Sequence, residues 1–196
     1  MTPQPIDLRP AVAADLDAIM ALERATDLAP HWPQSAYEDI LDSKDLGAPS
    51  MPRSVRNGWE PAAQRCLFIA EKNDSLIGFA VGLLHPGVLN PINLKQNCHS
   101  ERSEESPHLC ASYRIAELES VVVSTSARRA GIGRALCSAI LDWSRSHHAC
   151  EIVLEVRANS AAAIALYASL GFTLSARRPR YYRDPVDDAL LMRLVL

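Results

Sequence analysis

The sequence predicts an α/β protein, because β-strand patterns alternate with amphipathic helix patterns, above all in its second half. The 196 residues, 48% of them hydrophobic, can close one sizeable core but would make two rather small ones, so we expect a single domain over residues 1–196. A formal net charge of −3 argues against a chain that coats nucleic acid. The expected partner is therefore a small molecule or a short peptide, without direct binding of nucleic acid.

The first elements expected along the chain are one strand and two helices. Residues 6–10 have a strand pattern, and apolar residues recur at helical spacing over residues 15–26. Ser35 is predicted to be the N-cap of a second helix over residues 36–41. Residues 43–64 are rich in proline, glycine, asparagine and charge without a clear period, which predicts a long loop insertion.

A β-hairpin is expected next. Residues 66–70 and 76–84 are strand-like, and the Asn73-Asp74 pair between them is typical of a turn. Residues 85–114 follow, and their polar, partly low-complexity composition contains too little apolar surface to bury itself. We expect this segment to be a second, solvated insertion.

The remaining elements alternate between strand and helix. The patterns predict a strand over residues 118–123, a helix over about 133–147, a strand over 152–156, a helix over 161–170 and a closing pair of strands. This order is the main support for the α/β fold class.

One strand-to-helix turn has the chemistry of an anion site. Its residues are Arg128, Arg129, Ala130, Gly131, Ile132, Gly133 and Arg134. Backbone N–H groups at a helix start, reinforced by the helix dipole, bind anions, and glycine lets a phosphate approach closely. The spacing matches neither the dinucleotide-binding nor the ATP-binding glycine fingerprint, which argues against NAD and ATP. The alternative is that the two glycines merely relieve a tight turn.

A glutamate and a tyrosine are the candidate chemical residues. In the expected strand Glu155 alternates with Leu154, so the two side chains stand on opposite faces. Tyr167 falls late in an alanine-rich helix, on the same side as Ala163 and Ile164. The plain alternatives are a solvent-exposed or ion-paired glutamate and a tyrosine that packs in the core.

The turn resembles the signature of the GNAT superfamily of acetyltransferases, which Arg128, Gly131 and Gly133 match in identity and spacing. The resemblance implies the GNAT fold, a mixed and strongly twisted β-sheet with helices on both faces, and acetyl-CoA as the donor. It implies that amides of the turn wrap the CoA diphosphate while the backbone of the preceding strand pairs with the pantetheine arm. The residues implied to bind acetyl-CoA are Val121, Val122, Val123, Arg128, Arg129, Ala130, Gly131, Ile132, Gly133, Arg134 and Ser160.

Residues 154–172 resemble the RimI group of that superfamily, the bacterial ribosomal-protein alanine acetyltransferases. Shorter resemblances to the same group lie in residues 30–35, 177–182 and 188–192. The resemblance implies acetylation of a protein N-terminal α-amine, in this group the N-terminal alanine of ribosomal small-subunit protein 18. Two alternatives remain: the same fold acting on a lysine or a small-molecule amine, and a non-catalytic, CoA-binding regulatory module.

The RimI resemblance also implies roles for individual residues. Glu155 matches the general base and Tyr167 the general acid. A carboxylate acting through water can complete the deprotonation of an α-amine, whose pKa is about 7.7 to 8.0. Ser160 stands where the group has asparagine, with Asn159 one position earlier, and we expect at least one of the two to cap the following helix. Glu119 is a second candidate base, ranked below Glu155.

The sequence predicts neither a metal site nor a membrane segment. The candidate metal ligands do not have a recognised zinc spacing. They are Cys98, His99, His108 and Cys110. No charged leader precedes an apolar run, and no apolar stretch reaches the roughly 18 to 20 residues of a membrane span. The five cysteines are irregularly spaced, which suits reduced thiols and a cytoplasmic location.

Overall fold

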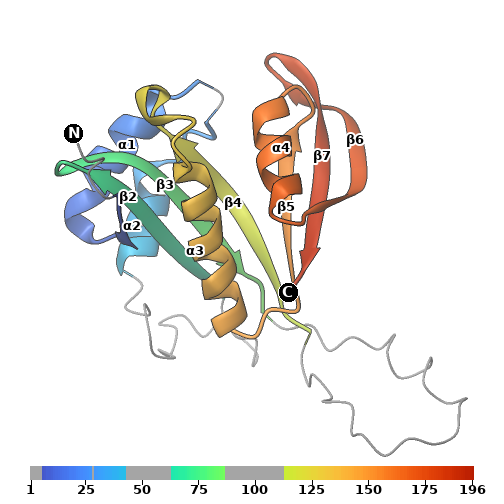
Figure 1. Ribbon diagram of the computed structural model, residues 1–196, viewed down its shortest axis with the longest axis horizontal. Helices are drawn as coiled ribbons and strands as arrows, with labels where there is room; N and C mark the ends of the chain where they lie inside the picture. The colour runs from blue at the N-terminus through green and yellow to red at the C-terminus, as the bar shows by residue number, and fades with distance from the viewer. Residues whose placement is uncertain (1–5, 28, 43–62, 87–112) are drawn as a thin grey trace, which may run out of the picture.

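The described part of the chain forms one seven-stranded β-sheet, shown in Figure 1. This computed structural model describes residues 6–27, 29–42, 63–86 and 113–196. The strands lie in the order β1-β2-β3-β4-β5-β7-β6, and every neighbouring pair in this sheet is antiparallel except β4 and β5. The bounds of the strands are β1 Asp7–Pro10, β2 Gln64–Lys72, β3 Ser75–Leu84, β4 Ile115–Val123, β5 Glu151–Arg157, β6 Thr173–Arg183 and β7 Val186–Val195.

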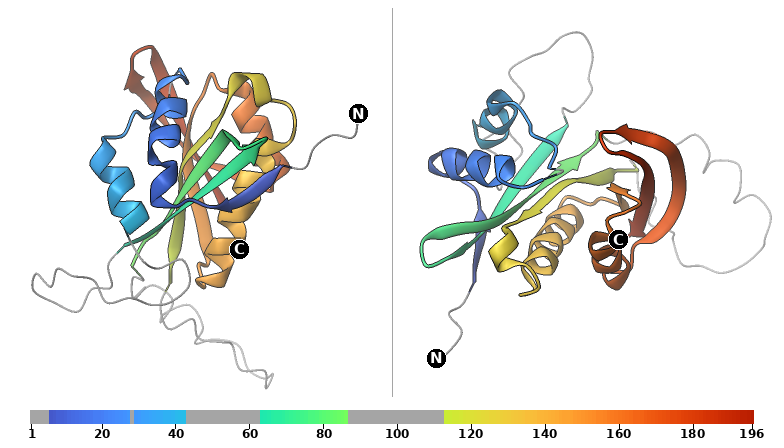
Figure 2. Two further views of the ribbon diagram at one scale, coloured as in Figure 1. Left: turned by 90° about the vertical axis from the view of Figure 1, so that its left-hand side faces the viewer. Right: turned by 90° about the horizontal axis from the view of Figure 1, so that it is seen from above.

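Helices cover both faces of the twisted sheet, with α1 and α2 on one face and α3 and α4 on the other (Figure 2). Two short 3₁₀ helices, η1 and η3, precede α1 and α3. The bounds are η1 Ala13–Asp15, α1 Leu16–Arg24, α2 Gln34–Asp42, η3 Thr125–Ala127, α3 Ile132–Ser146 and α4 Ala161–Ser169. A mixed sheet with helices on both faces is the architecture that the sequence predicts, and the prediction is confirmed.

The predicted elements are all found, but the prediction that Ser35 caps the second helix is wrong. α2 begins at Gln34, one residue before Ser35, and the N–H of Ala36 donates to the carbonyl of Pro33 at 3.0 Å. Proline suits the start of a helix because its φ is fixed and it has no N–H to satisfy. The helix therefore starts from Pro33 without a hydroxyl cap.

The expected hairpin is confirmed, whereas the two expected insertions fall mostly outside the described residues. Asn73 and Asp74 have φ angles of 52° and 57°, which are the left-handed values of a tight turn between β2 and β3. Of the insertions predicted over 43–64 and 85–114, the structure describes only residues 63, 64, 85, 86, 113 and 114, and of these only Gln64 belongs to a strand, β2. Among the described helices, none is long and apolar enough to cross a membrane.

Each face of the sheet has its own apolar core, built from the amphipathic helices that cover it. Leu136 and Ile140 of α3 pack with Leu154 of β5 on one face. Ile19 of α1 packs with Phe79 of β3 on the other. Because residues of β3 and β4 contribute to both cores, these central strands are held from both sides.

β4 contains a bulge that moves its side chains from one face of the sheet to the other. Leu118 and Ser120 pair with successive residues of β3, so Glu119 has no β3 partner of its own. Before the bulge Leu118 packs in the core of α3 and α4, and after it Val122 packs in the core of α1 and α2. Strict alternation would have put both side chains on one face, and the extra residue changes this.

A buried carboxylate fixes the connection between α1 and α2. Glu23 is 2% exposed, and its Oε1 accepts hydrogen bonds from the Tyr37 hydroxyl at 2.7 Å and from the backbone N–H of Trp32 at 3.1 Å. Burial and the adjacent carboxylate raise the pKa of Tyr37, so its hydroxyl remains a donor at neutral pH. The connection that resembles the RimI group is thereby anchored to the core.

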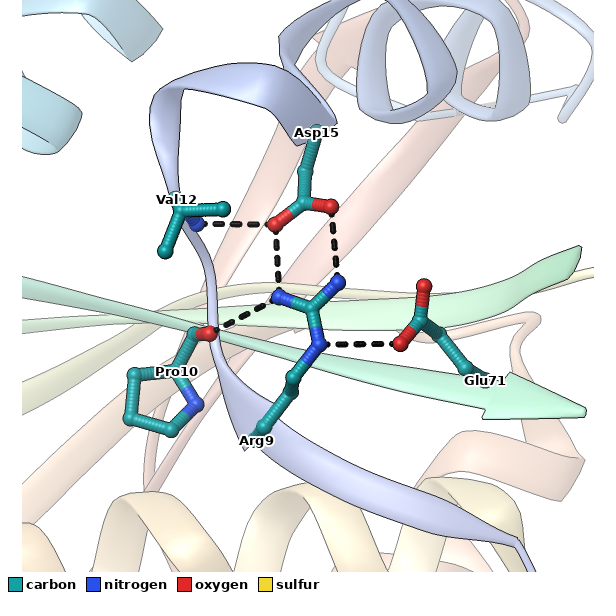
Figure 3. A network of polar contacts seen from close by, with 5 residues as sticks. All are labelled: Arg9, Pro10, Val12, Asp15 and Glu71. Carbon is teal, nitrogen blue, oxygen red and sulfur yellow. Dashed lines mark hydrogen bonds and ion pairs between the residues drawn. The ribbon is translucent and has the colours of Figure 1, made fainter. Parts of the chain in front are cut away.

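An arginine at the first strand ties three elements together, as Figure 3 shows. Arg9 donates to Asp15 through Nη1 at 2.8 Å and Nη2 at 2.9 Å, and its Nε donates to Glu71 at 2.9 Å. The carboxylate of Asp15 also accepts the N–H of Val12 at 2.8 Å. The hydrogen bonds from Arg9, followed by that from Val12, lower the pKa of Asp15 against the opposing effect of burial.

We predict that Asp15→Asn destabilises the protein by about 1 to 3 kcal/mol at pH 7, because it removes the charged acceptor of these hydrogen bonds. The folded state lowers the pKa of Asp15. Its contribution is therefore complete above the unfolded pKa of about 3.9 and is lost as pH falls towards the lower folded pKa. Urea unfolding at pH 7 and at about pH 3 measures this. The control is Asp17→Asn on the exposed side of α1, and a wild-type advantage that grows on acidification would contradict the prediction.

Candidate functional site

β4 and β5 separate after three paired positions, and the candidate residues lie around this opening. The pairs are Ile115 with Glu151, Ala116 with Ile152 and Glu117 with Val153. β5 stays paired with β7 along its whole length. Beyond Glu117, the β5-facing edge of β4 consequently has no strand partner in the described part of the chain. Figure 1 shows the two strands close at one end and apart at the other.

The turn from β4 into α3 carries a series of backbone N–H groups that the helix does not use. Ala135 makes the first hydrogen bond of α3, to the carbonyl of Gly131 at 3.0 Å. Among the described residues, the N–H groups of residues 129–134 have no backbone acceptor. Gly131 is the N-cap in a left-handed conformation, so α3 begins at Ile132 and not at the predicted Gly133. These N–H groups can serve an anion at the start of the helix.

The three arginines of this turn have different surroundings, although all are exposed. Arg128 donates through Nε to the carbonyl of Val123 at 3.3 Å, which joins the turn to the end of β4. Arg134 donates through Nη2 to Ser169 Oγ at 2.6 Å, which joins α3 to α4. Arg129 has φ of 68° and makes no side-chain hydrogen bond to the described residues. Its whole guanidinium is left available to an incoming group, while Arg128 and Arg134 keep their charge because their described acceptors are neutral.

The two glycines of the turn are needed for different reasons. Gly131 has φ of 82°, and a Cβ there would meet nothing within 4 Å, so the backbone conformation requires it. Gly133 has an ordinary φ, but a Cβ there would lie 3.2 Å from Cδ2 of Leu166 in α4. The first glycine shapes the turn, and the second allows α4 to approach α3.

The predicted donor-binding strand residues lie along the unpaired edge of β4. Val121 and Val123 pack against the core of α3 and α4, whereas Val122 is buried in the core of α1 and α2. Their side chains are therefore occupied with packing. The backbone groups of Val121 and Val123 point to the edge that faces away from β3 and can serve a ligand, whereas those of Val122 point to Phe79 of β3.

Glu155 occupies the predicted face of β5 and is ion-paired. Its face is opposite to that of the buried Leu154, and its side chain is 27% exposed. Arg178 of β6 donates to it, with 2.5 Å between Nη1 and Oε1. The ion-paired alternative thus describes the resting arrangement, while part of the carboxylate stays open to solvent.

Glu119, the second candidate base, is also paired with an arginine. Arg65 of β2 donates to both of its oxygens, through Nε at 2.8 Å and Nη2 at 3.1 Å. Because Glu117 is level with Val153, Glu119 comes level with Glu155 where the two strands separate. Both oxygens of Glu119 are thereby engaged, whereas the described contact to Glu155 engages one.

Tyr167 combines core packing with an available hydroxyl. It is the one buried residue of α4, and its ring centroid lies 5.9 Å from that of Phe172. The described residues supply no hydrogen-bond partner for the Tyr167 hydroxyl. Among these residues, every polar side-chain atom that is fully enclosed has a partner. The hydroxyl is therefore not fully enclosed and keeps some access to solvent. Burial raises the pKa of Tyr167, and the nearby Cys137 and Tyr182 add to this.

The expected helix cap before α4 is absent. Ser160 occupies the N-cap position with φ of −83° and ψ of 61°, and its side chain makes no capping hydrogen bond. These angles depart from the extended conformation that directs an N-cap side chain onto the first turn. Asn159 is exposed, and its backbone N–H donates to Asp187 at 3.3 Å. The prediction that one of the two caps α4 is therefore wrong.

Sequence reasoning missed the arginines that organise the β6–β7 hairpin. Arg157 lies with its guanidinium carbon 4.0 Å from the ring centroid of Tyr182 and donates to the carbonyls of Asp184 and Pro185, both at 3.1 Å. It fixes the hairpin turn to the end of β5. The density of arginine and tyrosine in residues 177–183 was the available signal, and it does not tell which acceptor each arginine reaches.

The described residues contain no group of three or more His, Cys, Asp and Glu side chains that could hold a metal ion. Cys66 and Cys137 are buried thiols. Burial raises the pKa of both, which keeps them protonated. The four candidate metal ligands of the sequence analysis lie outside the described residues. They are Cys98, His99, His108 and Cys110.

Sequence comparison relates the chain to acetyltransferases. The family profile described as the acetyltransferase (GNAT) family matches residues 26–172. An uncharacterised protein of Mycobacterium leprae is 29% identical over 191 residues, which are 97% of this chain and 41% of that protein. The ribosomal protein bS18-alanine N-acetyltransferase of Escherichia coli strain K12 is 42% identical over 81 residues, 40% of this chain and 55% of that enzyme. The chain thus spans about half the length of the curated relatives it matches.

Two solved structures share the fold of nearly the whole chain. The ribosomal-protein-S18-alanine N-acetyltransferase of Escherichia coli has a TM-score of 0.64 at 24% identity, covering 97% of this chain and 94% of that one. The NatC complex bound to Gag peptide and CoA has a TM-score of 0.67 at 22% identity, covering 98% of this chain and 99% of that one. At these identities the likeness shows the fold alone.

The left-handed conformation of Gly131 leads to a stability prediction. We expect Gly131→Ala to lower the free energy of unfolding by about 1 to 2 kcal/mol, because an L side chain is strained at positive φ. Gly131→Asn should cost less, because asparagine tolerates this region. Urea unfolding of both variants measures the difference, and equal costs would show that backbone strain is not the cause.

Proposed function

The chain belongs to the acetyltransferase (GNAT) family, and we propose that it transfers an acetyl group from acetyl-CoA to the N-terminal α-amine of a protein. The observation that carries the proposal is the separation of β4 from β5 next to the unused N–H groups at the start of α3. This combination provides a binding place for an anionic donor on one side of the opening and a binding place for an amine acceptor on the other.

For the donor, we assign the diphosphate of acetyl-CoA to the N–H groups of residues 129–134 and to the unpaired charge of Arg129. The amide-containing pantetheine arm would pair with the free backbone edge of β4 at Val121 and Val123, as an added strand does. The same backbone would supply N–H donors to the oxyanion that forms when the thioester carbonyl is attacked. Ser160, at the start of α4, would face the same arm.

For the acceptor, we assign the base to Glu155. The neutral amine attacks the carbonyl carbon of the thioester, the C–S bond breaks, and the proton of the amine passes to the carboxylate directly or through one water. An α-amine with a pKa of about 7.7 to 8.0 needs less help to lose its proton than a lysine, whose pKa is about 10.4. One carboxylate at a partly open position suits that demand.

For the departing thiolate, we assign the hydrogen-bond donor to the Tyr167 hydroxyl. Its raised pKa keeps it protonated through the neutral range. The same shift makes it a weaker acid than a free tyrosine, so we expect hydrogen bonding to the sulfur to outweigh complete proton transfer. CoA then leaves with its charge partly neutralised at the sulfur.

The names of the relatives favour a protein N-terminus as the acceptor, with a ribosomal protein as the first candidate. We predict that a peptide beginning with alanine is acetylated at its α-amine by the purified chain with acetyl-CoA. Mass spectrometry would compare this peptide with one whose N-terminus is blocked but which contains a lysine, and with a small primary amine. Acetylation of the lysine or the small amine without any N-terminal product would contradict the assignment.

Substitutions in the proposed machinery test the roles separately. We expect Glu155→Gln to lower kcat roughly 100-fold or more, and Tyr167→Phe roughly 10-fold or more, with the ring packing retained in the second variant. Thiol release from acetyl-CoA in the presence of the accepted peptide measures both. Glu151→Gln, on the same face of β5 but at its paired end, is the matched control and should stay near wild type.

Glu119→Gln decides between the two candidate bases. A loss of kcat in this variant equal to or larger than that of Glu155→Gln would move the base to β4. Equal background thiol release in the wild type and all variants would instead support a CoA-binding protein without catalysis.

A further inference from the structure

The carboxylate that we assign as the base is already occupied by a cation of the chain itself. Arg178 Nη1 lies 2.5 Å from Glu155 Oε1, so one of the two oxygens that could accept an amine proton already holds a hydrogen-bond donor. A guanidinium remains protonated in proteins and therefore cannot relay that proton. An acceptor amine and Arg178 consequently draw on the same carboxylate, and they compete directly where the amine approaches Oε1.

The sheet is built so that this contact can form across an intervening strand. Arg178 of β6 is level with Ala189 of β7, which is in turn level with Arg157 of β5. Glu155 lies two residues before Arg157 on the same face, so the side chain of Arg178 reaches it over Ala189. Ala189 is small and fully buried, which leaves room for the crossing side chain.

Arg178 also has a second partner close by. Its side chain is 51% exposed, and its guanidinium carbon lies 5.5 Å from the ring centroid of Tyr181 on the same hairpin. A cation within about 6 Å of an aromatic face is attracted to it. The ring is already a partner of the guanidinium while Arg178 pairs with Glu155, and a displaced Arg178 can keep this contact.

We propose that Arg178 holds, in the acceptor-free enzyme, the position at Glu155 that the acceptor amino group takes on binding, so that each acceptor has to displace it. This inference rests on the proposed acetyl transfer through Glu155. Arg178 is then neither a base nor a substrate ligand but an internal competitor, and it sets how tightly an amine binds without taking part in the transfer.

The experiment compares the full chain with its Arg178→Gln and Arg178→Lys variants at saturating acetyl-CoA, using whichever amine the wild type acetylates. We expect Arg178→Gln to lower the KM for the acceptor about three- to fivefold, the range for a partly exposed ion pair, with kcat within twofold. Arg178→Lys keeps a cation and should stay within about twofold of the wild-type KM. Thermal melting of each variant checks that the fold is retained.

Two controls separate competition from a general effect on the acceptor groove. An analogue of the acceptor with its amino group replaced by hydrogen should inhibit the wild type and Arg178→Gln with the same constant, because it cannot compete for Glu155. Arg177→Gln removes another ion pair of the same strand, 2.6 Å from Arg177 Nε to Asp188 Oδ2, and should leave the KM within twofold.

An unchanged or raised KM in Arg178→Gln, a fall in kcat alone, or equal changes for acceptor and analogue would each overturn the competition while leaving the proposed function intact. A wild type that acetylates no amine would overturn the proposed function itself, and the competition with it. The wild-type measurement therefore tells the two failures apart before any variant is compared.

Discussion

The separation of β4 from β5 is the constraint on which the candidate site depends. Inside a continuous sheet each strand edge is satisfied by its neighbour, but beyond Glu117 the β5-facing edge of β4 has none in the described chain. β5 keeps its pairing with β7 over its whole length, and beyond Val153 its own β4-facing edge likewise has no strand partner in the described chain. The bulge at Glu119 adds local twist at the point where the strands diverge. An extended, amide-rich molecule can pair with such an edge as a further strand would.

The charges around the opening are divided between its two faces. The N–H groups of residues 129–134 and the unpaired Arg129 make the start of α3 favourable for an anion. On the face covered by α1 and α2, Glu119 and Glu155 come level with each other, and each is neutralised by an arginine from a strand farther out. The two pairs differ in kind. Arg65 engages both carboxylate oxygens of Glu119, whereas the contact from Arg178 engages one oxygen of Glu155. This difference is the physical reason to place proton transfer at Glu155.

Local patterns were sufficient to predict the order of the elements and the strand-to-helix turn at residues 128–134, because both depend on residues adjacent in sequence. The same holds for the face of Glu155, since alternation along β5 is uninterrupted. The bulge in β4 could not be predicted, because Val121, Val122 and Val123 suit either face. The partners of Glu119 and Glu155 lie 54 and 23 residues away in sequence, across strands whose order no local pattern fixes. Capping by Ser160 failed for the opposite reason: the residue type was right, but the backbone angles were not.

The position of α4 links the donor turn to the proposed acid. α4 buries one residue, Tyr167, so that ring is its main anchor in the core. Two further contacts join α4 to the first turn of α3: Leu166 packs where Gly133 has no side chain, and Ser169 accepts a hydrogen bond from Arg134. A change that shifts the start of α3 must therefore also shift the helix that carries the Tyr167 hydroxyl. Binding of the diphosphate at this turn would then restrain the group that we assign to the departing sulfur, which couples recognition of one end of acetyl-CoA to chemistry at the other.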